Sequence, residues 1–300
     1  MQTAQSCTLK FGIKASRSIR SSIFPRGRSD PGSGFAVTPV LVFDIETIPD
    51  IAGLRRLRAD WRDLADAEVA EFALNERREK TGGDFLPLYL QRIVTISCVL
   101  RNEAGFRVGS IGTAGDPEAT LIQSFFGMID RHTPQIVSWN GSSFDLPVLH
   151  YRGLLAGVSA ARYWELGVDD PEFRYNNYIG RYHTRHIDLM DVLALYQSRA
   201  NAPLDVLSRL AGYPGKLGMD GSQVWQAYRD GQIEQIRSYC ETDVVNTYLL
   251  FNRFQRMRGV LNDVQHAAEE ALVRESLQGL PAPHWREYLE AWPAAAAAAN

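Results

Sequence analysis

Cysteine is scarce in this sequence, and the few cysteines present are not grouped. Cys7, Cys98 and Cys240 stand far apart among 300 residues. They show neither a disulfide framework nor the spacing of a structural zinc site, which is typical of a reducing compartment. No stretch approaches the roughly 18 apolar residues that a membrane-spanning helix needs, and residues 1–39 lack the apolar core of a secretory signal. We therefore expect a soluble, cytoplasmic protein.

An excess of positive charge is also missing. The chain has 32 Lys and Arg against 35 Asp and Glu, a formal net charge of −3. Such a chain has no general attraction for phosphate backbones, so any binding of nucleic acid must come from a local feature such as bound cations. With 45% hydrophobic and 22% charged side chains, it falls in the ordinary globular class and can bury one large core.

The ends of the chain differ in composition from its middle. Residues 1–38 are rich in Ser, Gly and Pro, with six Lys or Arg and the single acid Asp30, which predicts a disordered basic extension. A transit peptide and a misassigned start are alternative interpretations. We expect a main domain over residues 39–258, with a helical insertion at about 51–82. A helical C-terminal segment follows over 259–300 and ends in a low-complexity alanine tail.

The hydrophobic pattern of the main domain indicates an α/β fold. The apolar run Val40-Leu41-Val42-Phe43 predicts a buried strand. Strands at 92–100 and 105–111 make an antiparallel meander with it, and strands near 135–139 and 186–189 then alternate with helices. Helices are predicted at 117–131, 190–197, 204–210, 222–229 and 233–254. The expected architecture is a mixed sheet, three antiparallel strands and then parallel strands, flanked by helices.

The first candidate site residues directly follow the first strand. Strand side chains alternate between faces, so Asp44 and Glu46 project from the same face near the strand's end. Two like charges held there require a cation. Taken alone, the pair is equally explained as a solvated rim or a helix cap.

The second candidate segment is WNGSSFDLP, residues 139–147. A strand stops here in a turn, and Asp145 stands just before or within the next helix, where it is also explained as a helix N-cap. Phe144 beside an acid suits stacking on a nucleobase. Asn140 and Phe144 are equally explained as a turn residue and a core residue.

The third candidate segment is YCETD, residues 239–243, within a predicted helix. Positions four apart lie on one helix face, so Tyr239 and Asp243 point the same way. A structural hydrogen bond between them explains the pair as well. The four carboxylates of the three segments, if they converge, match what two Mg²⁺ or Mn²⁺ ions need for phosphodiester hydrolysis.

In chain order, DIET at Asp44, NGSSFDLP around Asp145 and YCETD at Asp243 resemble the three exonuclease motifs of the DEDD superfamily. The tyrosine four residues before the last aspartate, with Ser238 rather than His before it, resembles the tyrosine (DEDDy) branch. The chain is similar to stand-alone predicted exonucleases related to the exonuclease domain of family B DNA polymerases, over roughly residues 38–290, and its length leaves no room for a polymerase domain. FLPLYLQRIVTIS, HIDLMDVLALY, LAGYPGKLGMDGSQVW and HWREYLEAW fit that group.

The resemblance implies an RNase H-like fold, two divalent cations and removal of nucleotides from 3′ ends, with single-stranded DNA as the favoured substrate. It implies that Asp44 bridges both cations and that Asp145 supports one of them. Glu46 and Asp243 hold the cation that activates water, and Tyr239 orients that water. Ile48, Asn140 and Phe144 are expected to contact the substrate. An exoribonuclease and a catalytically silent nucleic-acid-binding module are the alternatives.

Three further features remain open. Residues 163–186 interleave aromatic and basic side chains, which suits either gripping of single strands or ordinary packing. Lys216 is a possible phosphate contact, although the Pro-Gly-Lys segment around it lacks the spacing of a nucleotide-binding loop. Asp188 ends a short strand and is expected to cap the following helix or to lie in the outer shell of the cations.

Overall fold

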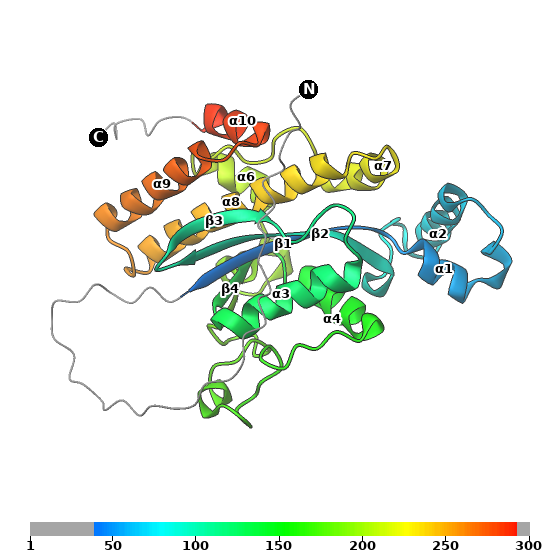
Figure 1. The fold of residues 1–300 in the computed structure, drawn as a ribbon, viewed down its shortest axis with the longest axis horizontal. Coiled ribbons are helices and arrows are strands. Elements are labelled where there is room, and N and C mark those ends of the chain that lie inside the picture. The colour runs from blue at the N-terminus through cyan, green and yellow to red at the C-terminus, as the bar shows by residue number, and fades with distance from the viewer. Residues whose placement is uncertain (1–38, 293–300) are drawn as a thin grey trace, which may run out of the picture.

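The computed structural model describes residues 39–292. The predicted basic extension at residues 1–38 and the alanine tail lie outside the described residues. Within them the chain forms a mixed sheet with helices above and below it (Figure 1). Among residues 39–292, no helix combines the length and apolar character needed to cross a membrane.

The sheet has five strands in the order β3-β2-β1-β4-β5. The pairs β1–β2 and β2–β3 are antiparallel, and the pairs β1–β4 and β4–β5 are parallel. The predicted α/β class, a mixed sheet with antiparallel strands first and parallel strands after them, is therefore confirmed. The strands span β1 Val40–Pro49, β2 Gln91–Asn102, β3 Gly105–Ser110, β4 Gln135–Ser138 and β5 His186–Asp188.

Side-chain alternation along the central strand β1 separates two cores. Leu41, Phe43 and Ile45 pack on the side of α3 and α4, whereas Val40 and Val42 pack on the side of α8. Asp44 and Glu46 continue the second series, so the pattern directs them toward α8. The helices of the first side are α3 Glu118–His132 and α4 Asp145–Ala156.

The long helix α8, Ile233–Met257, lies between the sheet and the C-terminal helices (Figure 1). It packs on β1 and β2 with one side and on α9 with another, and its buried residues run around most of its surface from Ile236 to Asn252. The remaining helices of this layer are α5 Leu189–Leu193, α6 Leu204–Leu210, α7 Val224–Arg229, α9 Asp263–Gln278 and α10 Pro283–Ala291.

The predicted helical insertion contains helices α1, Ile51–Leu57, and α2, Asp66–Thr81. Leu54, Trp61 and Val69 form a small core of their own there. The helix α2 ends at Gly82, whose φ of +79° suits a residue without a Cβ atom. In Figure 1 the insertion lies to one side of the sheet.

Two predicted boundaries were wrong. The strand β1 does not end at the carboxylates but continues to Pro49, with a register shift between Glu46 and Thr47; such a bulge bends a strand without ending it. The helix predicted at 190–197 ends at Leu193. The next residues, Leu195 and Tyr196, have φ angles of 51° and 59°, which a right-handed helix does not accommodate.

Candidate active site

A pocket of about 600 Å³ opens where the parallel strands β1 and β4 separate. The two strands pair only from Val40 to Val42, so within the described part of the chain β1 has no strand partner on that side beyond Val42. The pocket is lined by three of the predicted segments together: Asp44, Glu46, Asn140, Phe144, Asp145, Tyr239 and Asp243, and also by Lys216 and Asp205.

Asp44 and Glu46 enter the pocket from β1. Burial raises the pKa of both carboxyl groups well above their ordinary values, and neighbouring acids raise them further: Asp145, Glu46 and Asp243 for Asp44, and Asp243 and Asp145 for Glu46, while Lys216 acts in the opposite direction on Glu46. A cluster of carboxylates that resists ionisation is one that a cation would stabilise.

Asp145 is the first residue of α4 and is 3% exposed. Its Oδ1 accepts a hydrogen bond of 3.1 Å from the backbone N–H of Ile45, on the side of β1 that β4 has left. Burial raises its pKa to about 7 although this hydrogen bond acts in the opposite direction. The N-cap of α4 is Phe144, so the N-cap explanation of Asp145 was wrong.

The turn before α4 is held by Asp188 at the end of β5. Its carboxylate accepts hydrogen bonds from the backbone N–H groups of Asn140 at 3.0 Å and Ser142 at 2.8 Å, and it also caps α5 through Asp191. Asn140 has a φ of 68°, a left-handed conformation that asparagine tolerates. Asp188 therefore shapes the turn that brings Asp145 to β1.

Tyr239 and Asp243 lie one turn apart on α8 and meet Lys216 from the loop after α6. The Lys216 ammonium donates a hydrogen bond to the Tyr239 hydroxyl and lies 3.5 Å from Asp243 Oδ2. Burial lowers the pKa of Lys216, but the charges of Asp243, Glu46 and Asp44 outweigh it and the pKa is raised. Lys216 is therefore a cation among the carboxylates.

Asp243 has an acceptor that the described residues leave unused. Burial raises its pKa to about 6, while Lys216 and Tyr239 act in the opposite direction. Within residues 39–292 its Oδ1 is buried and accepts no hydrogen bond. Orphaned buried acceptors of this kind are uncommon, and a divalent cation is a group that such an oxygen can bind.

Cys240, between the tyrosine and the aspartate, was not singled out in the sequence. Its thiol donates hydrogen bonds to Asp44 Oδ2 at 3.3 Å and to the Asp44 backbone oxygen at 3.5 Å. The ligand atoms of Asp44, Glu46 and Cys240 all fall within 4.8 Å of one another. Burial raises the pKa of the thiol well above its usual value, so it stays protonated and orients Asp44 rather than binding a hard cation.

The donor set therefore fits divalent cations of the Mg²⁺ class: four buried or partly buried carboxylates, one with a free oxygen, face one cavity. Asp145 and Asp243 lie outside the 4.8 Å group. They share the cavity wall with it, so cations between these acids would join them.

The predicted substrate contacts are placed differently. Asn140 and Phe144 line the pocket, and the Phe144 ring packs on Phe85 at 5.6 Å between centroids. Ile48 is only 1% exposed and packs with Val94 and Ile236; it is not part of the pocket lining. Ile48 continues the face of Asp44 and Glu46, but α7 and α8 cover that face at Ile48, so the side chain is a core residue.

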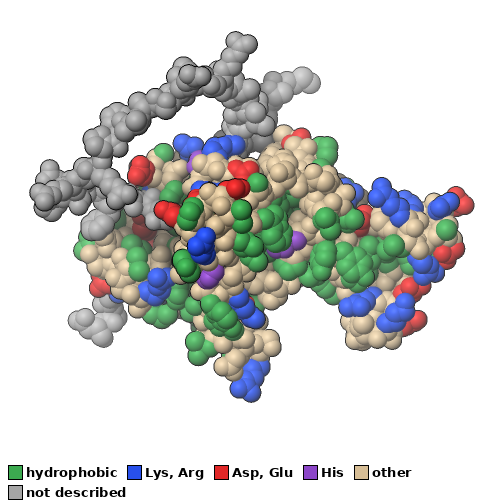
Figure 2. All heavy atoms as spheres, turned by 90° about the horizontal axis from the view of Figure 1, so that it is seen from below, with side chains coloured by type: hydrophobic (Ala, Val, Ile, Leu, Met, Phe, Trp, Pro, Cys, Tyr) green, Lys and Arg blue, Asp and Glu red, His purple; other side chains and the backbone are tan. Residues whose placement is uncertain are grey.

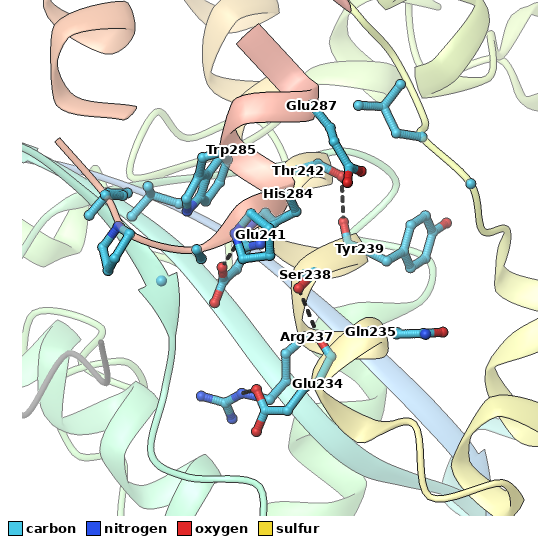
Figure 3. A pocket seen from close by; sticks show the side chains of 18 of the residues that line it. Glu234, Gln235, Arg237, Ser238, Tyr239, Glu241, Thr242, His284, Trp285 and Glu287 are labelled. Carbon is cyan, nitrogen blue, oxygen red and sulfur yellow. Dashed lines mark hydrogen bonds and ion pairs between the residues drawn. The ribbon is translucent and has the colours of Figure 1, made fainter. Parts of the chain in front are cut away.

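A second cavity, of about 970 Å³, lies beside the first and shares Tyr239 with it. Figure 3 shows Glu241 and His284 pointing toward one another while Tyr239 points away from them. The His284 Nε2 lies 3.1 Å from Glu241 Oε2, and Glu241 Oε1 accepts a 2.9 Å hydrogen bond from the backbone of Ser110. These contacts join α10, α8 and β3 around that cavity.

Comparisons with known proteins agree in part with this site. Residues 83–292 match the model of a family described as predicted 3′-5′ exonucleases related to the exonuclease domain of PolB; Asp145, Tyr239 and Asp243 fall inside the matched stretch, and Asp44 and Glu46 precede it. No curated protein matches the chain. Among solved structures, the chain is similar to the family B DNA polymerase from the hyperthermophilic archaeon Pyrobaculum calidifontis, with 18% identity and a TM-score of 0.48. That match covers 83% of this chain and 27% of the polymerase chain.

Proposed function

Because the chain belongs to the family of predicted 3′-5′ exonucleases related to the exonuclease domain of PolB, we propose that it removes nucleotides from the 3′ ends of single-stranded DNA with the help of two divalent cations, Mg²⁺ or Mn²⁺. The observation that supports this most is the meeting of Asp44, Glu46, Asp145, Tyr239 and Asp243 in one pocket. In the reaction the bond between phosphorus and the 3′ oxygen breaks, a bond to a water oxygen forms, and a nucleoside 5′-monophosphate leaves.

The carboxylates would divide between two cations according to their electrostatic neighbours. Asp44 is the acid whose pKa responds to all three others, which supports its contact with both cations. Glu46 responds first to Asp243 among its acidic neighbours, so this pair would hold one cation, while Asp145 would hold the other. When bound, the cations stabilise the charge on the attacking and leaving oxygens.

Tyr239 orients the attacking water in this proposal. Burial raises the pKa of its hydroxyl, and the charges of Asp243, Glu46 and Asp44 raise it further, so the group keeps its proton at neutral pH. It cannot then act as a general base. Its oxygen accepts a hydrogen bond from Lys216, and its hydroxyl is also hydrogen-bonded to Asp243, whose pKa it lowers. A water that Tyr239 orients would therefore lie next to Asp243.

Lys216 supplies positive charge beside the reacting phosphate. It lies with Asp243 and Tyr239 on one side of the pocket. The net negative charge of the protein does not attract phosphate. A fixed ammonium at this point would supply that attraction locally. It also offsets the charge of the acids when no cation is bound.

The experiment that tests the proposal is a digestion series with 3′-labelled and 5′-labelled oligonucleotides of DNA and RNA, single and double stranded, with Mg²⁺ or Mn²⁺. We expect release of labelled mononucleotide from 3′-labelled single-stranded DNA and a descending ladder from the 5′-labelled strand. Preferred digestion of RNA would instead identify an exoribonuclease. Binding without cleavage under all conditions would identify a silent nucleic-acid-binding module.

A further inference from the structure

Three large aromatic side chains outside the pocket, one of which contacts Phe144 of its lining, are exposed. Phe85 is 58% exposed, Tyr89 49% and Tyr151 46%. They belong to the segment before β2 and to α4. The helix α4 lies below the sheet in Figure 1, on the face of the molecule that Figure 2 shows. Hydrophobic side chains gather on that face, and exposed apolar groups next to a functional pocket commonly mark a binding surface.

Together with Phe144, these side chains form two pairs that bridge the same two segments. Phe85 packs on Phe144 with 5.6 Å between ring centroids, and Tyr89 packs on Tyr151 at 6.1 Å with the rings nearly perpendicular, at 83°. Phe144 and Tyr151 are seven residues apart, which is two helical turns or about 10 Å along α4. The pairs therefore follow one another along the helix axis.

The row begins at the candidate active site. Phe144 lines the pocket and directly precedes Asp145. From there α4 leads away from the carboxylates, and the Tyr89–Tyr151 pair lies two turns farther along it. A strand whose 3′ end lies at the carboxylates would meet this row with its preceding nucleotides.

Buried ion pairs hold the two segments in place. Arg152, next to Tyr151, contacts Asp50 at 2.5 Å and Glu118 at 2.6 Å, and all three are largely buried. Its Nη1 also reaches the Tyr89 backbone oxygen at 3.5 Å. The rings are thus presented by a rigid base, which lowers the entropy lost when a ligand binds.

The chemistry of the row suits unpaired bases. Aromatic faces stack on nucleobases whatever their sequence, and single strands expose those faces whereas duplexes do not. A cation is also close, because Arg77 Nε donates a 3.1 Å hydrogen bond to the Phe85 backbone oxygen. We propose that the Phe85–Phe144 and Tyr89–Tyr151 pairs form a binding site for the single-stranded nucleotides that precede the scissile bond; this rests on the proposed function.

The test compares two substrates of the whole protein with Mn²⁺. One is an oligothymidylate of about ten nucleotides, long enough to reach both pairs; the other is the p-nitrophenyl ester of thymidine 5′-monophosphate, which is too short to leave the pocket. For the variant Tyr89→Ala/Tyr151→Ala we expect the ratio of kcat/KM for the oligonucleotide to that for the ester to fall about tenfold. The variant Tyr89→Phe/Tyr151→Phe, which keeps the rings, should restore most of the ratio.

Val264→Ala is the control, because Val264 is an exposed apolar side chain, at 78%, on α9 and therefore on the other side of the sheet from α4. Its ratio should equal that of the wild type. A ratio unchanged in Tyr89→Ala/Tyr151→Ala, or lowered equally by Val264→Ala, overturns the inference. Wild-type protein that cleaves neither substrate refutes the proposed function instead, and fluorescence anisotropy of a labelled oligothymidylate then decides the binding site by the same comparison of variants.

Discussion

The phenolic hydroxyl of Tyr288 donates a 2.8 Å hydrogen bond to Asn246 Oδ1. Asn246 Nδ2 in turn donates a 2.9 Å hydrogen bond to the backbone oxygen of Gly215, the residue before Lys216. Both side chains are completely buried. Asn246 follows Tyr239 and Asp243 along the same face of α8, so one helix face contacts the Lys216 loop at three successive points. The C-terminal helix α10 is therefore linked through two hydrogen bonds to the loop of the candidate site.

The first prediction concerns this link. Tyr288→Phe keeps the ring but leaves a buried amide oxygen of Asn246 without its donor, which should lower the free energy of unfolding by about 1–3 kcal/mol. Urea unfolding measures the loss, and hydrogen exchange should show faster exchange at residues 212–218. Tyr175→Phe, at an exposed position, serves as the control. Unchanged exchange in the Lys216 loop would show that the link does not hold the loop.

The second prediction concerns Lys216 itself. Lys216→Met removes the ammonium but keeps a long apolar side chain, and kcat on single-stranded DNA should fall about a hundredfold because one preorganised charge at the phosphate is lost. Lys216→Arg keeps the charge and should retain more activity. The neighbouring Leu217→Met variant controls for a change in the loop. A kcat within twofold of the wild type in Lys216→Met would exclude an electrostatic role in the reaction.

The third prediction concerns stability without cations. The pKa of Asp145 is raised by burial from 3.8 to about 7, so the folded state favours the protonated form. Its contribution to stability is complete below pH 3.8 and is lost as the pH rises through 7. Asp145→Asn, which stays neutral, should therefore have a higher free energy of unfolding than the wild type at pH 8 in EDTA, by up to about 4 kcal/mol. Its unfolding temperature should be higher as a result.

The difference between these two proteins should shrink toward pH 5, where Asp145 of the wild type is protonated. Added Mn²⁺ should raise the unfolding temperature of the wild type more than that of Asp145→Asn, because a bound ligand stabilises the folded state. Differential scanning fluorimetry across pH measures both effects. A lower unfolding temperature for Asp145→Asn at pH 8 in EDTA would contradict this account of the acidic cluster.

Much of this architecture could be predicted from local pattern. The alternation in β1 is strictly local, so it correctly placed Asp44 and Glu46 on one face. Helical spacing likewise placed Tyr239 and Asp243 together. Their catalytic roles stay predictions, because spacing shows which residues share a face and not what they bind.

Other features depend on contacts between distant segments and could not be predicted. Two distant side chains set the position of Lys216. Asn246, thirty residues onward, donates a hydrogen bond to the Gly215 backbone oxygen, and the Asp205 carboxylate accepts a 2.7 Å hydrogen bond from the backbone N–H of Lys216. Ile48 was expected at the substrate, but Val224 of α7 and Ile236 of α8 pack against it and bury it. The sequence did carry one signal beside Lys216, the preceding Gly215. In the structure this glycine has a φ of +70°, a conformation that favours glycine.

The central claim is that the acidic cluster acts through bound cations, and cleavage of 3′-labelled single-stranded DNA by the wild type and by Asp44→Asn tests it most directly. With Mn²⁺ we expect the wild type to release labelled mononucleotide, EDTA to abolish the release, and Asp44→Asn to be slower by about a thousandfold or more while folding normally by circular dichroism. Mononucleotide release that persists in EDTA, or that proceeds at the wild-type rate in Asp44→Asn, would contradict it.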